Sequence, residues 1–337
     1  MEALLASGVA VDGVIVCTPH ATHYAVGQQL LAAGTIAHVL MEKPFTTDVD
    51  EAKALHELVA TAAAGGGGRL KSFQVNHSAN WRTQTMQAAA AVREGRLGSV
   101  QHVTCFMGSP LACIFDEPSC RNWNEPTGKM VGNGFGWGQM SHIFAWVYQV
   151  TGLEPESVSC SMTYSDKTGA DVYDAGVVTC RGGATIAFSG VACLPGDAHS
   201  ATPAGKIIDC KVFGSEGSLL YGGDDRDPSS GRLELRRNDG NVVFEGGFQF
   251  EDCGESGAGP QSVRAFVDAC RGQGFRVPAA VGGAGAEGAA GGAAEGGAAA
   301  AALEYDGASS AVGLKTVQTI DAMYRSAKSG APERVVV

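Results

Sequence analysis

The apolar positions near the start of the chain predict a strand, a helix and a second strand. An apolar run covers residues 14–17, apolar residues then recur at helical spacing over 26–33, and a second short run covers 38–41. A strand, a helix and another strand within about thirty residues form a unit that is typical of a parallel sheet. The sequence therefore predicts an α/β arrangement in this region.

Polar residues follow both of these predicted strands. Thr18 and Pro19 come after the first strand, and Glu42, Lys43 and Pro44 come after the second. In open parallel sheets, ligands bind outside the carboxyl ends of the strands. We therefore expect these five residues to lie at a ligand site.

Farther along the chain, short segments of alternating apolar and polar residues replace this pattern. A helix that begins near residue 47, a strand over 70–75 and a helix over 83–94 come first. The alternation beyond them predicts a mostly antiparallel open sheet. Its expected strands cover residues 99–107, 157–163, 175–180, 184–193, 207–213, 218–221, 233–236 and 242–244. The fold class is thus α/β plus α+β.

A glycine-rich stretch over residues 132–142 leads into a predicted helix with one buried apolar stripe. The stripe consists of Ile143, Trp146, Val147 and Val150. His142 lies about 100° round the helix from the first of these, at the edge of the stripe. Residues 108–134 read as a long polar loop, and because long loops are usually functional or disordered, we expect a loop near the substrate.

The remaining segments contain no strong candidates for functional residues. Helices are expected over 261–270 and 309–327, and the Ala- and Gly-rich residues 279–302 are expected to form a flexible insertion. Asp171 and Asp174 are interpreted as a turn residue and a residue at a strand edge.

Composition and charge exclude several classes of protein. The 337 residues, 45% of them hydrophobic, are enough for two domains, and the net charge of −11 argues against a nucleic-acid or anionic-membrane partner. No apolar run reaches the ~20 residues of a membrane span, and the start lacks the basic residues of a secretory signal. Ten scattered cysteines without a Cys-x-x-Cys pair indicate reduced thiols in a cytoplasmic protein, and no zinc spacing or other metal site is found.

The polar motifs after the two strands resemble those of the Gfo/Idh/MocA oxidoreductases, the family of glucose-fructose oxidoreductase and inositol dehydrogenase. Family members carry Thr-Pro with a His four residues after the Pro, here Thr18, Pro19 and His23. They also carry Glu-Lys-Pro after the next strand, here at 42–44, with a Pro that the resemblance suggests is cis. Later landmarks at residues 93–98, 214–218 and 324–330 agree.

This resemblance implies three parts of the chain. Residues 1–76 would form a partial Rossmann-type domain that binds NAD or NADP. Residues 77–306 would form an α+β domain for the substrate and for homo-oligomer formation through the antiparallel sheet. Residues 307–337 would form a C-terminal helix and tail that pack back on the first domain.

The implied activity is hydride transfer between the nicotinamide of NAD or NADP and a hydroxyl carbon of a sugar or cyclic polyol. Lys43 and His142 would be the catalytic residues that handle the proton, and they should converge on one cleft between the two domains. The cofactor-binding candidates are Thr18, Pro19, His20, His23, Glu42, Lys43 and Pro44. Weaker substrate candidates are Asn76, Trp81, Arg82, Trp123 and Gln139.

Two departures from the family pattern leave an alternative open. The family has an Asp four residues before the His, where this chain has Gly138. No strand with a Gly-rich phosphate turn precedes residue 14, so the resemblance implies that roughly sixty residues are absent, as in a fragment. The alternative is a non-catalytic family member that binds a sugar-like ligand or assembles through its sheet. Another βαβ enzyme, such as a methyltransferase, would also need the Gly-rich loop.

Overall fold

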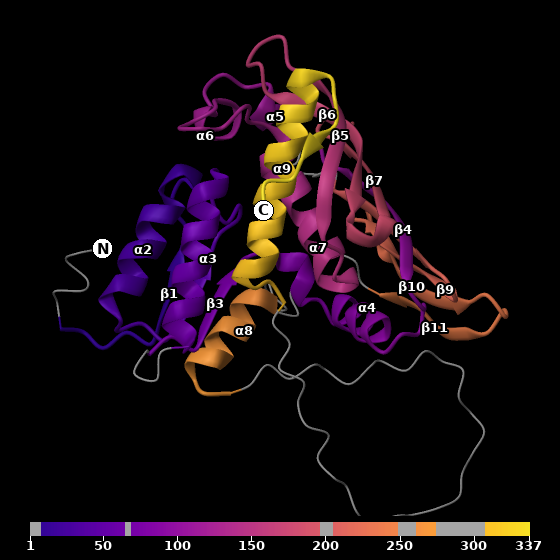
Figure 1. Ribbon diagram of the computed structural model, residues 1–337, viewed down its shortest axis with the longest axis horizontal. Helices are drawn as coiled ribbons and strands as arrows, with labels where there is room; N and C mark the ends of the chain where they lie inside the picture. Colours follow the sequence, from indigo (N-terminus) through magenta and orange to yellow (C-terminus); the bar gives the residue numbers. More distant parts are fainter. Residues whose placement is uncertain (1–7, 65–68, 196–204, 249–260, 274–306) are drawn as a thin grey trace, which may run out of the picture.

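Two β-sheets organise the chain, and the long helices lie between them or against one of them (Figure 1). The computed structural model describes residues 8–64, 69–195, 205–248, 261–273 and 307–337. The expected insertion over 279–302 lies outside the described residues.

The smaller sheet is parallel and has the strand order β1-β2-β3. Its strands are β1 (Gly13–Val16), β2 (His38–Met41) and β3 (Ser72–Val75), joined by α2 (His23–Ala33) and α3 (Val49–Ala64). The predicted strand–helix–strand unit is confirmed. Its first strand ends one residue earlier than predicted, because the ladder to β2 stops at Val16. All three strands point the same way, so the residues that follow them meet at one edge.

The larger sheet has the order β11-β10-β9-β8-β4-β7-β6-β5-β12. Neighbours β4 and β7 run parallel and the other neighbouring pairs run antiparallel, which confirms the predicted sheet. The strands are β4 (Val100–Gly108), β5 (Pro155–Tyr164), β6 (Asp171–Cys180), β7 (Thr185–Val191), β8 (Ile207–Gly214), β9 (Gly217–Asp224), β10 (Asp227–Arg237), β11 (Val242–Phe248) and β12 (Glu333–Arg334).

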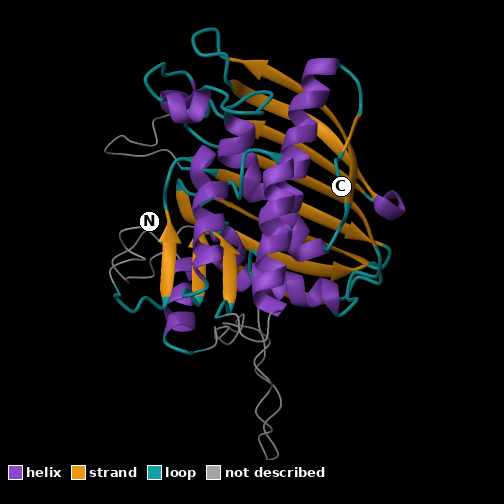
Figure 2. Ribbon diagram, turned by 60° about the vertical axis from the view of Figure 1, so that its left-hand side comes forward, coloured by secondary structure: helices purple, strands orange, loops and turns teal. Residues whose placement is uncertain are grey.

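Helices cover one face of the larger sheet and leave the other face bare (Figure 2). Helix α8 (Gln261–Cys270) instead contacts β2 of the smaller sheet. The covering helices include α4 (Thr83–Arg93), α7 (Ser141–Thr151) and α9 (Ser310–Ser329). The last of these contacts α3 in the first part of the chain and β5 in the second. It therefore ties the two sheets together, although the domain boundaries at residues 76 and 306 stay a prediction. None of the described helices combines the length and the apolar composition needed to cross a bilayer.

Two predictions about local structure were wrong. The supposed loop over 108–134 contains two short helices, α5 (Ala112–Phe115) and α6 (Arg121–Asn124). Asp171 and Asp174 lie within β6, between two neighbouring strands, and both are buried. Strand alternation predicts β6 only over its apolar half, because buried carboxylates break the apolar pattern. The start of the strand was therefore missed.

Helix α7 is the centre of the core. The predicted stripe is confirmed, since its residues are at most 1% exposed, but Phe144 and Tyr148 on the other sides are also buried. The helix lies between α4, α9 and the large sheet and is therefore apolar on nearly every side. Trp146 anchors it, with its ring stacked 4.7 Å from that of Tyr221 and its Nε1 donating to Thr85 Oγ1.

We expect Trp146→Ala to lower the free energy of unfolding by about 3–5 kcal/mol, because it leaves a large cavity at the centre of the core. Urea denaturation followed by circular dichroism measures this change. The matched control is Leu58→Ala on α3, whose side chain is 36% exposed; we expect it to change stability by less than about 0.5 kcal/mol. Equal effects of the two substitutions would contradict the central role of α7.

Candidate active site

Lys43 reaches from the end of β2 to the segment that leads into α7. Its peptide bond to Pro44 is cis, as the resemblance suggested. The Lys43 Nζ donates a hydrogen bond to the Gly138 carbonyl oxygen at 2.6 Å, and it lies 4.9 Å from the centre of the Trp123 ring. A cation over an indole face is attracted by the ring's quadrupole. The ammonium is therefore held between a carbonyl dipole and an aromatic face.

This environment changes the protonation of Lys43. Burial, which disfavours the charged form, lowers the pKa of its ammonium to about 8; the carboxylate of Glu42 opposes the shift and the charge of Lys206 adds to it. A lysine with a pKa near 8 can exchange a proton close to neutral pH, whereas an ordinary lysine stays charged.

Glu42 and Asn76 join the ends of β2 and β3. The Asn76 Nδ2 donates to Glu42 Oε1 at 2.6 Å, and the main-chain N–H of Lys43 donates to Glu42 Oε2 at 3.3 Å. The Oδ1 of Asn76 is buried without a hydrogen-bond partner among the described residues. An unpaired buried acceptor is costly, so this atom is free to accept from a ligand.

His23 is a structural clamp at the ends of β1 and β2. Its side chain is fully buried, with Nδ1 2.7 Å from the Pro44 carbonyl oxygen and Nε2 3.0 Å from the Thr18 carbonyl oxygen. Burial lowers the pKa of His23 and the two carbonyls oppose this shift. A neutral ring donates to one of these carbonyls at a time. Both ring nitrogens are thus occupied by the main chain, which favours positioning over a cofactor contact.

His142 lies at the start of α7 beside a second histidine that the sequence analysis missed. The rings of His77 and His142 meet edge to face with their centres 5.9 Å apart. Burial, followed by the charge of Lys43, lowers the pKa of His77 to about 3. The pKa of His142 also falls well below its ordinary value, first through burial and then through Lys43. The charge of Lys43 thus acts on both histidines, which are neutral at neutral pH, and the catalytic roles of Lys43 and His142 stay a prediction.

His77 is fully buried, and neither of its ring nitrogens has a hydrogen-bond partner among the described residues. It directly follows Asn76 at the carboxyl end of β3, so the strand-end rule could have identified it. The sequence analysis applied this rule to β1 and β2 and counted only the asparagine after β3.

Gly138 shows why the carboxylate of the family pattern is missing. A Cβ atom at this position would lie 2.7 Å from Phe115 Cζ and 3.6 Å from Trp123 Cε3. The space for a side chain is thus already filled by α5 and α6. Gly138 belongs to the π-helical turn Gly136–Met140, a type of turn that is frequent at functional sites.

The carboxylate of Asp171 holds the π-helical turn in place by a hydrogen bond to its main chain. Its Oδ2 accepts from the Gly136 N–H at 2.6 Å, and its Oδ1 accepts from the Tyr324 hydroxyl at 2.5 Å. Burial and the nearby charge of Asp171 raise the pKa of Asp174 well above its ordinary value. Asp171 thus supports the turn from the core side.

The other predicted residues lie close to Lys43 or in its surroundings. The ring of His20 packs edge to face on Trp123 at 4.5 Å, and burial followed by Lys43 lowers its pKa to about 4. Gln139 is 8% exposed, and its Oε1 is buried without a partner among the described residues. Trp81 belongs to the hydrophobic core, which favours packing over substrate contact.

The last three predicted residues lie apart from one another. Arg82 contacts a strand of the large sheet, whereas Thr18 and Pro19 follow β1. The Arg82 Nη1 donates to the Tyr221 hydroxyl at 3.2 Å, beneath the large sheet. Thr18 and Pro19 are exposed at the end of β1, where the Thr18 hydroxyl accepts from that of Thr22 at 2.8 Å.

Comparisons with known proteins identify matching families and relatives. The family model described as "Oxidoreductase family, NAD-binding Rossmann fold" matches residues 1–64, and the GFO/IDH/MocA C-terminal domain model matches residues 85–220. UDP-N-acetylglucosamine 3-dehydrogenase of Acidithiobacillus ferrooxidans is 49% identical over 55 residues, 16% of each protein. An uncharacterized oxidoreductase of Escherichia coli is 30% identical over 92 residues, 27% of this chain and 24% of the relative. The chain thus aligns with a quarter or less of the length of these curated relatives.

Solved structures extend the likeness over nearly the whole chain. An oxidoreductase domain protein from Kribbella flavida has a TM-score of 0.67 at 21% identity, covering 99% of this chain and 83% of that one. Levoglucosan dehydrogenase in complex with NADH has a TM-score of 0.65 at 15% identity, covering 99% and 82%. These identities show a shared fold. Because the two family models together match more than half of the chain, the protein belongs to the Gfo/Idh/MocA family of oxidoreductases.

Proposed function

We propose that the protein is an NAD(P)-dependent oxidoreductase that acts on a hydroxyl carbon of a sugar or cyclic polyol. The observation that carries this proposal is the Lys43 ammonium, whose pKa is lowered to about 8 and which lies between two sheets beside two neutral histidines. Two similar proteins, UDP-N-acetylglucosamine 3-dehydrogenase and levoglucosan dehydrogenase, are sugar dehydrogenases by name. They support a carbohydrate-like substrate.

The residues around Lys43 fit the nicotinamide end of a dinucleotide. The Oδ1 of Asn76 and the Oε1 of Gln139 are buried acceptors without described partners, and a carboxamide supplies the donors that they lack. Glu42, Lys43 and Pro44 would hold this group at the carboxyl edge of the small sheet. A nicotinamide dinucleotide supplies hydride chemistry when bound. The described residues contain no Gly-rich phosphate turn of the Rossmann type.

In this proposal, Lys43 is the residue that exchanges a proton with the substrate hydroxyl. A neutral amine at Lys43 accepts the hydroxyl proton during oxidation, and the ammonium returns it during reduction. His142 was expected to share this step, but an imidazole whose pKa lies far below 6.5 is a weak proton acceptor at neutral pH. We therefore assign His142 to orienting the substrate hydroxyl through a hydrogen bond from its neutral ring.

The alternative, a non-catalytic member that binds a sugar-like ligand, is favoured by Gly138. The space that the family's Asp would need contains Phe115 and Trp123. The two functions differ in one measurement. An enzyme reduces NAD or NADP in the presence of sugars or polyols, whereas the alternative binds a sugar and leaves the dinucleotide unchanged.

We expect Lys43→Ala to lower turnover by about 10²–10⁴-fold, because a positioned proton acceptor is lost. The assay follows NADH or NADPH absorbance with the most active compound of a sugar and polyol panel. Lys71→Ala is the matched control, because this exposed lysine precedes β3 at the opposite edge of the same sheet. Unchanged turnover of Lys43→Ala, in a variant with the circular dichroism of the parent, would remove Lys43 from the mechanism.

The pH dependence of kcat/KM should follow the titration of the Lys43 side chain. In the oxidation direction, kcat/KM rises as pH increases through about 8, because only the neutral amine accepts a proton. In the reduction direction the sign reverses, and activity falls over the same range because the ammonium is the donor. Initial rates from pH 6 to 10 measure both limbs. A single transition near the ordinary histidine pKa of about 6.5 would instead assign the proton to His142.

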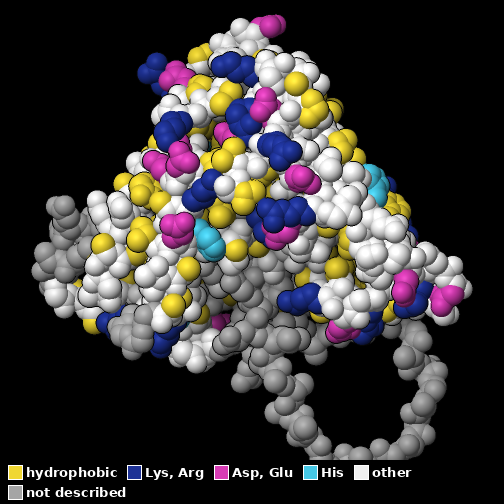
Figure 3. Space-filling view, in the orientation of Figure 1, with side chains coloured by type: hydrophobic (Ala, Val, Ile, Leu, Met, Phe, Trp, Pro, Cys, Tyr) yellow, Lys and Arg dark blue, Asp and Glu magenta, His cyan; other side chains and the backbone are white. Residues whose placement is uncertain are grey.

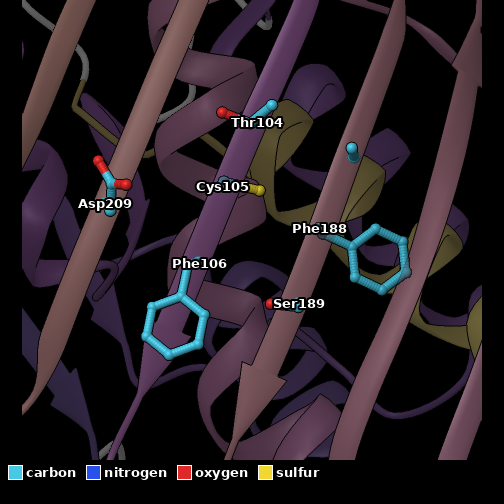
Figure 4. Close-up of a pocket in the computed structure, with 7 residues that line it drawn as sticks. Thr104, Cys105, Phe106, Phe188, Ser189 and Asp209 are labelled. Carbon is cyan, nitrogen blue, oxygen red and sulfur yellow. The ribbon is translucent and has the colours of Figure 1, made fainter.

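We also propose that the protein forms a homo-oligomer through the bare face of the large sheet. Tyr173, Val177 and Phe213 on this face are 43%, 40% and 39% exposed. Beside them lies a shallow depression of about 330 Å³ lined by Thr104, Phe106, Ala187, Ser189 and Asp209, among others (Figure 4). An exposed face with several large apolar side chains is typical of an interaction surface, and a second copy would cover it.

Val177→Glu should convert this oligomer into monomers, because it places an unpaired charge at the centre of the apolar face. Analytical ultracentrifugation measures the mass of the particle. Leu58→Glu on α3 is the control, since it adds the same charge at an exposed apolar position away from the sheet. A parent protein that is monomeric, or a Val177→Glu variant of unchanged mass, would contradict this interface.

A further inference from the structure

A buried hydrogen-bonded pair, Asp171 and Tyr324, contacts the turn whose carbonyl binds Lys43. Asp171 is the first residue of β6, and Tyr324 belongs to α9. The two side chains are 1% and 2% exposed. One carboxylate oxygen of Asp171 accepts from the Tyr324 hydroxyl at 2.5 Å, and the other accepts from the Gly136 N–H at 2.6 Å. The pair therefore joins the last long helix to the start of the π-helical turn.

The Gly136 N–H needs an acceptor from outside the turn. The first N–H groups of a helix have no partner within the helix, and Gly136 is the first residue of the π-helical turn. A buried N–H without an acceptor is costly, so Asp171 supplies one. Gly138, whose carbonyl oxygen accepts from Lys43 Nζ at 2.6 Å, lies two residues farther along the same turn. A displacement of Gly136 therefore moves the atom that binds the lysine.

The ring of Tyr324 holds the same turn through packing. A Cβ atom at Gly132 would lie 2.6 Å from Tyr324 Cδ1, and one at Gly136 would lie 2.9 Å from the Tyr324 hydroxyl oxygen. The Trp137 ring stacks on the Tyr324 ring with their centres 6.1 Å apart, and its Nε1 donates to the Gly132 carbonyl oxygen at 3.1 Å. The glycine-rich main chain thus lies directly against one side chain of α9.

The path from Asp171 to Lys43 runs through main-chain atoms of the turn. The charges that act on the pKa of Lys43 come from Glu42 and Lys206. The imidazoles whose pKa values the lysine lowers are those of His20, His23, His77 and His142. An effect of Asp171 on the lysine through the turn can therefore be separated from an effect of charge.

Building on the proposed function, we propose that Asp171 and Tyr324 are positioning residues for proton exchange at Lys43, because they hold the Gly138 carbonyl oxygen where it binds the ammonium. Both residues act through the turn, and neither exchanges a proton with the substrate. The bond to the Gly138 carbonyl stabilises the charged form of Lys43 and orients its nitrogen. A side chain of α9, far from Lys43 in the sequence, thereby sets the geometry of the proton step.

Tyr324→Phe is the first test, because it deletes the hydroxyl and keeps the ring that packs on the turn. NMR titration of labelled lysine in the full chain, without cofactor or substrate, measures the Lys43 transition. A hydrogen bond to the charged form raises a pKa, so weakening it should lower this transition by about 0.5 pH unit. In turnover assays, kcat should fall about threefold or more and KM should change less than about twofold, because positioning acts on the chemical step.

Asp171→Asn should give a larger effect in the same direction. An amide nitrogen replaces one of the two acceptor oxygens, so either Gly136 or Tyr324 loses its acceptor. We expect the Lys43 transition to fall by about 1 pH unit and kcat to fall about tenfold. This variant also changes the titratable groups of the core, whereas Tyr324→Phe adds or removes no charge at neutral pH. A shift in both variants supports positioning through the turn.

Tyr148→Phe is the matched control for Tyr324→Phe. The Tyr148 hydroxyl is also buried and also contacts α9, where it lies 2.6 Å from Thr319 Oγ1. Its loss should lower stability in urea denaturation and leave the Lys43 transition and kcat unchanged. Lysine and arginine side chains are spread over the face seen in Figure 3, so exposed lysines supply reference signals in the same titration.

Two results would overturn the inference. One is a Tyr324→Phe variant with the circular dichroism of the parent and an unchanged or raised Lys43 transition, even if Asp171→Asn shifts it. The other is an equal shift in Tyr148→Phe, which would indicate a general loosening of the core.

The NMR titration requires no turnover, so failure of this inference is distinguishable from failure of the proposed function. An inactive parent whose Lys43 transition responds to Tyr324→Phe keeps the positioning pair and removes the enzyme. An active parent whose Lys43 transition ignores Tyr324→Phe keeps the oxidoreductase and removes the positioning pair.

Discussion

The hydrogen bond between the Lys43 ammonium and the Gly138 carbonyl is the interaction on which the rest of the site depends. It spans 2.6 Å between the end of a strand in one sheet and the turn that precedes the central helix of the other part. A buried ammonium needs a partner, because an isolated charge in a low-dielectric interior is strongly disfavoured. The carbonyl, the Trp123 ring and Glu42 together meet this need only in part, and the pKa of the lysine falls to about 8 as a result.

Several features of the fold support this one contact. Asp171 fixes the π-helical turn through the Gly136 N–H, and His23 holds the main chain at Pro44 from the other side. Phe115 fills the space beside Gly138, so that the turn presents a carbonyl oxygen where a side chain is excluded. The site around Lys43 therefore combines a cation of lowered pKa with neutral imidazoles, and Gly138 stands where the family pattern has a carboxylate. This combination makes the lysine the group best suited to exchange a proton.

Much of this arrangement could be predicted from residues whose signal is local. Glu42, Lys43 and Pro44 follow an apolar strand, and the parallel-sheet rule alone places them at a ligand site. The missing parts depend on contacts between distant segments. Lys206 has no local signal, because it lowers the pKa of Lys43 from a segment that is distant in the sequence. Asp171 and Asp174 were misinterpreted because the sequence alone does not distinguish a buried Asp in a strand from an Asp in a turn. The neutral state of His142 was also hidden, since it results from burial and from the charges of residues in other parts of the chain, Lys43 first among them.

The most direct test of the account is the pKa of the Lys43 side chain itself. Selective ¹³C labelling of lysine followed by NMR titration measures it, and Lys43→Arg assigns the resonance. The account predicts a transition near pH 8 for Lys43 and ordinary values for the exposed lysines. A transition of Lys43 at the ordinary lysine value of about 10.4 would contradict it, because a fully solvated ammonium is incompatible with a buried site between the two sheets.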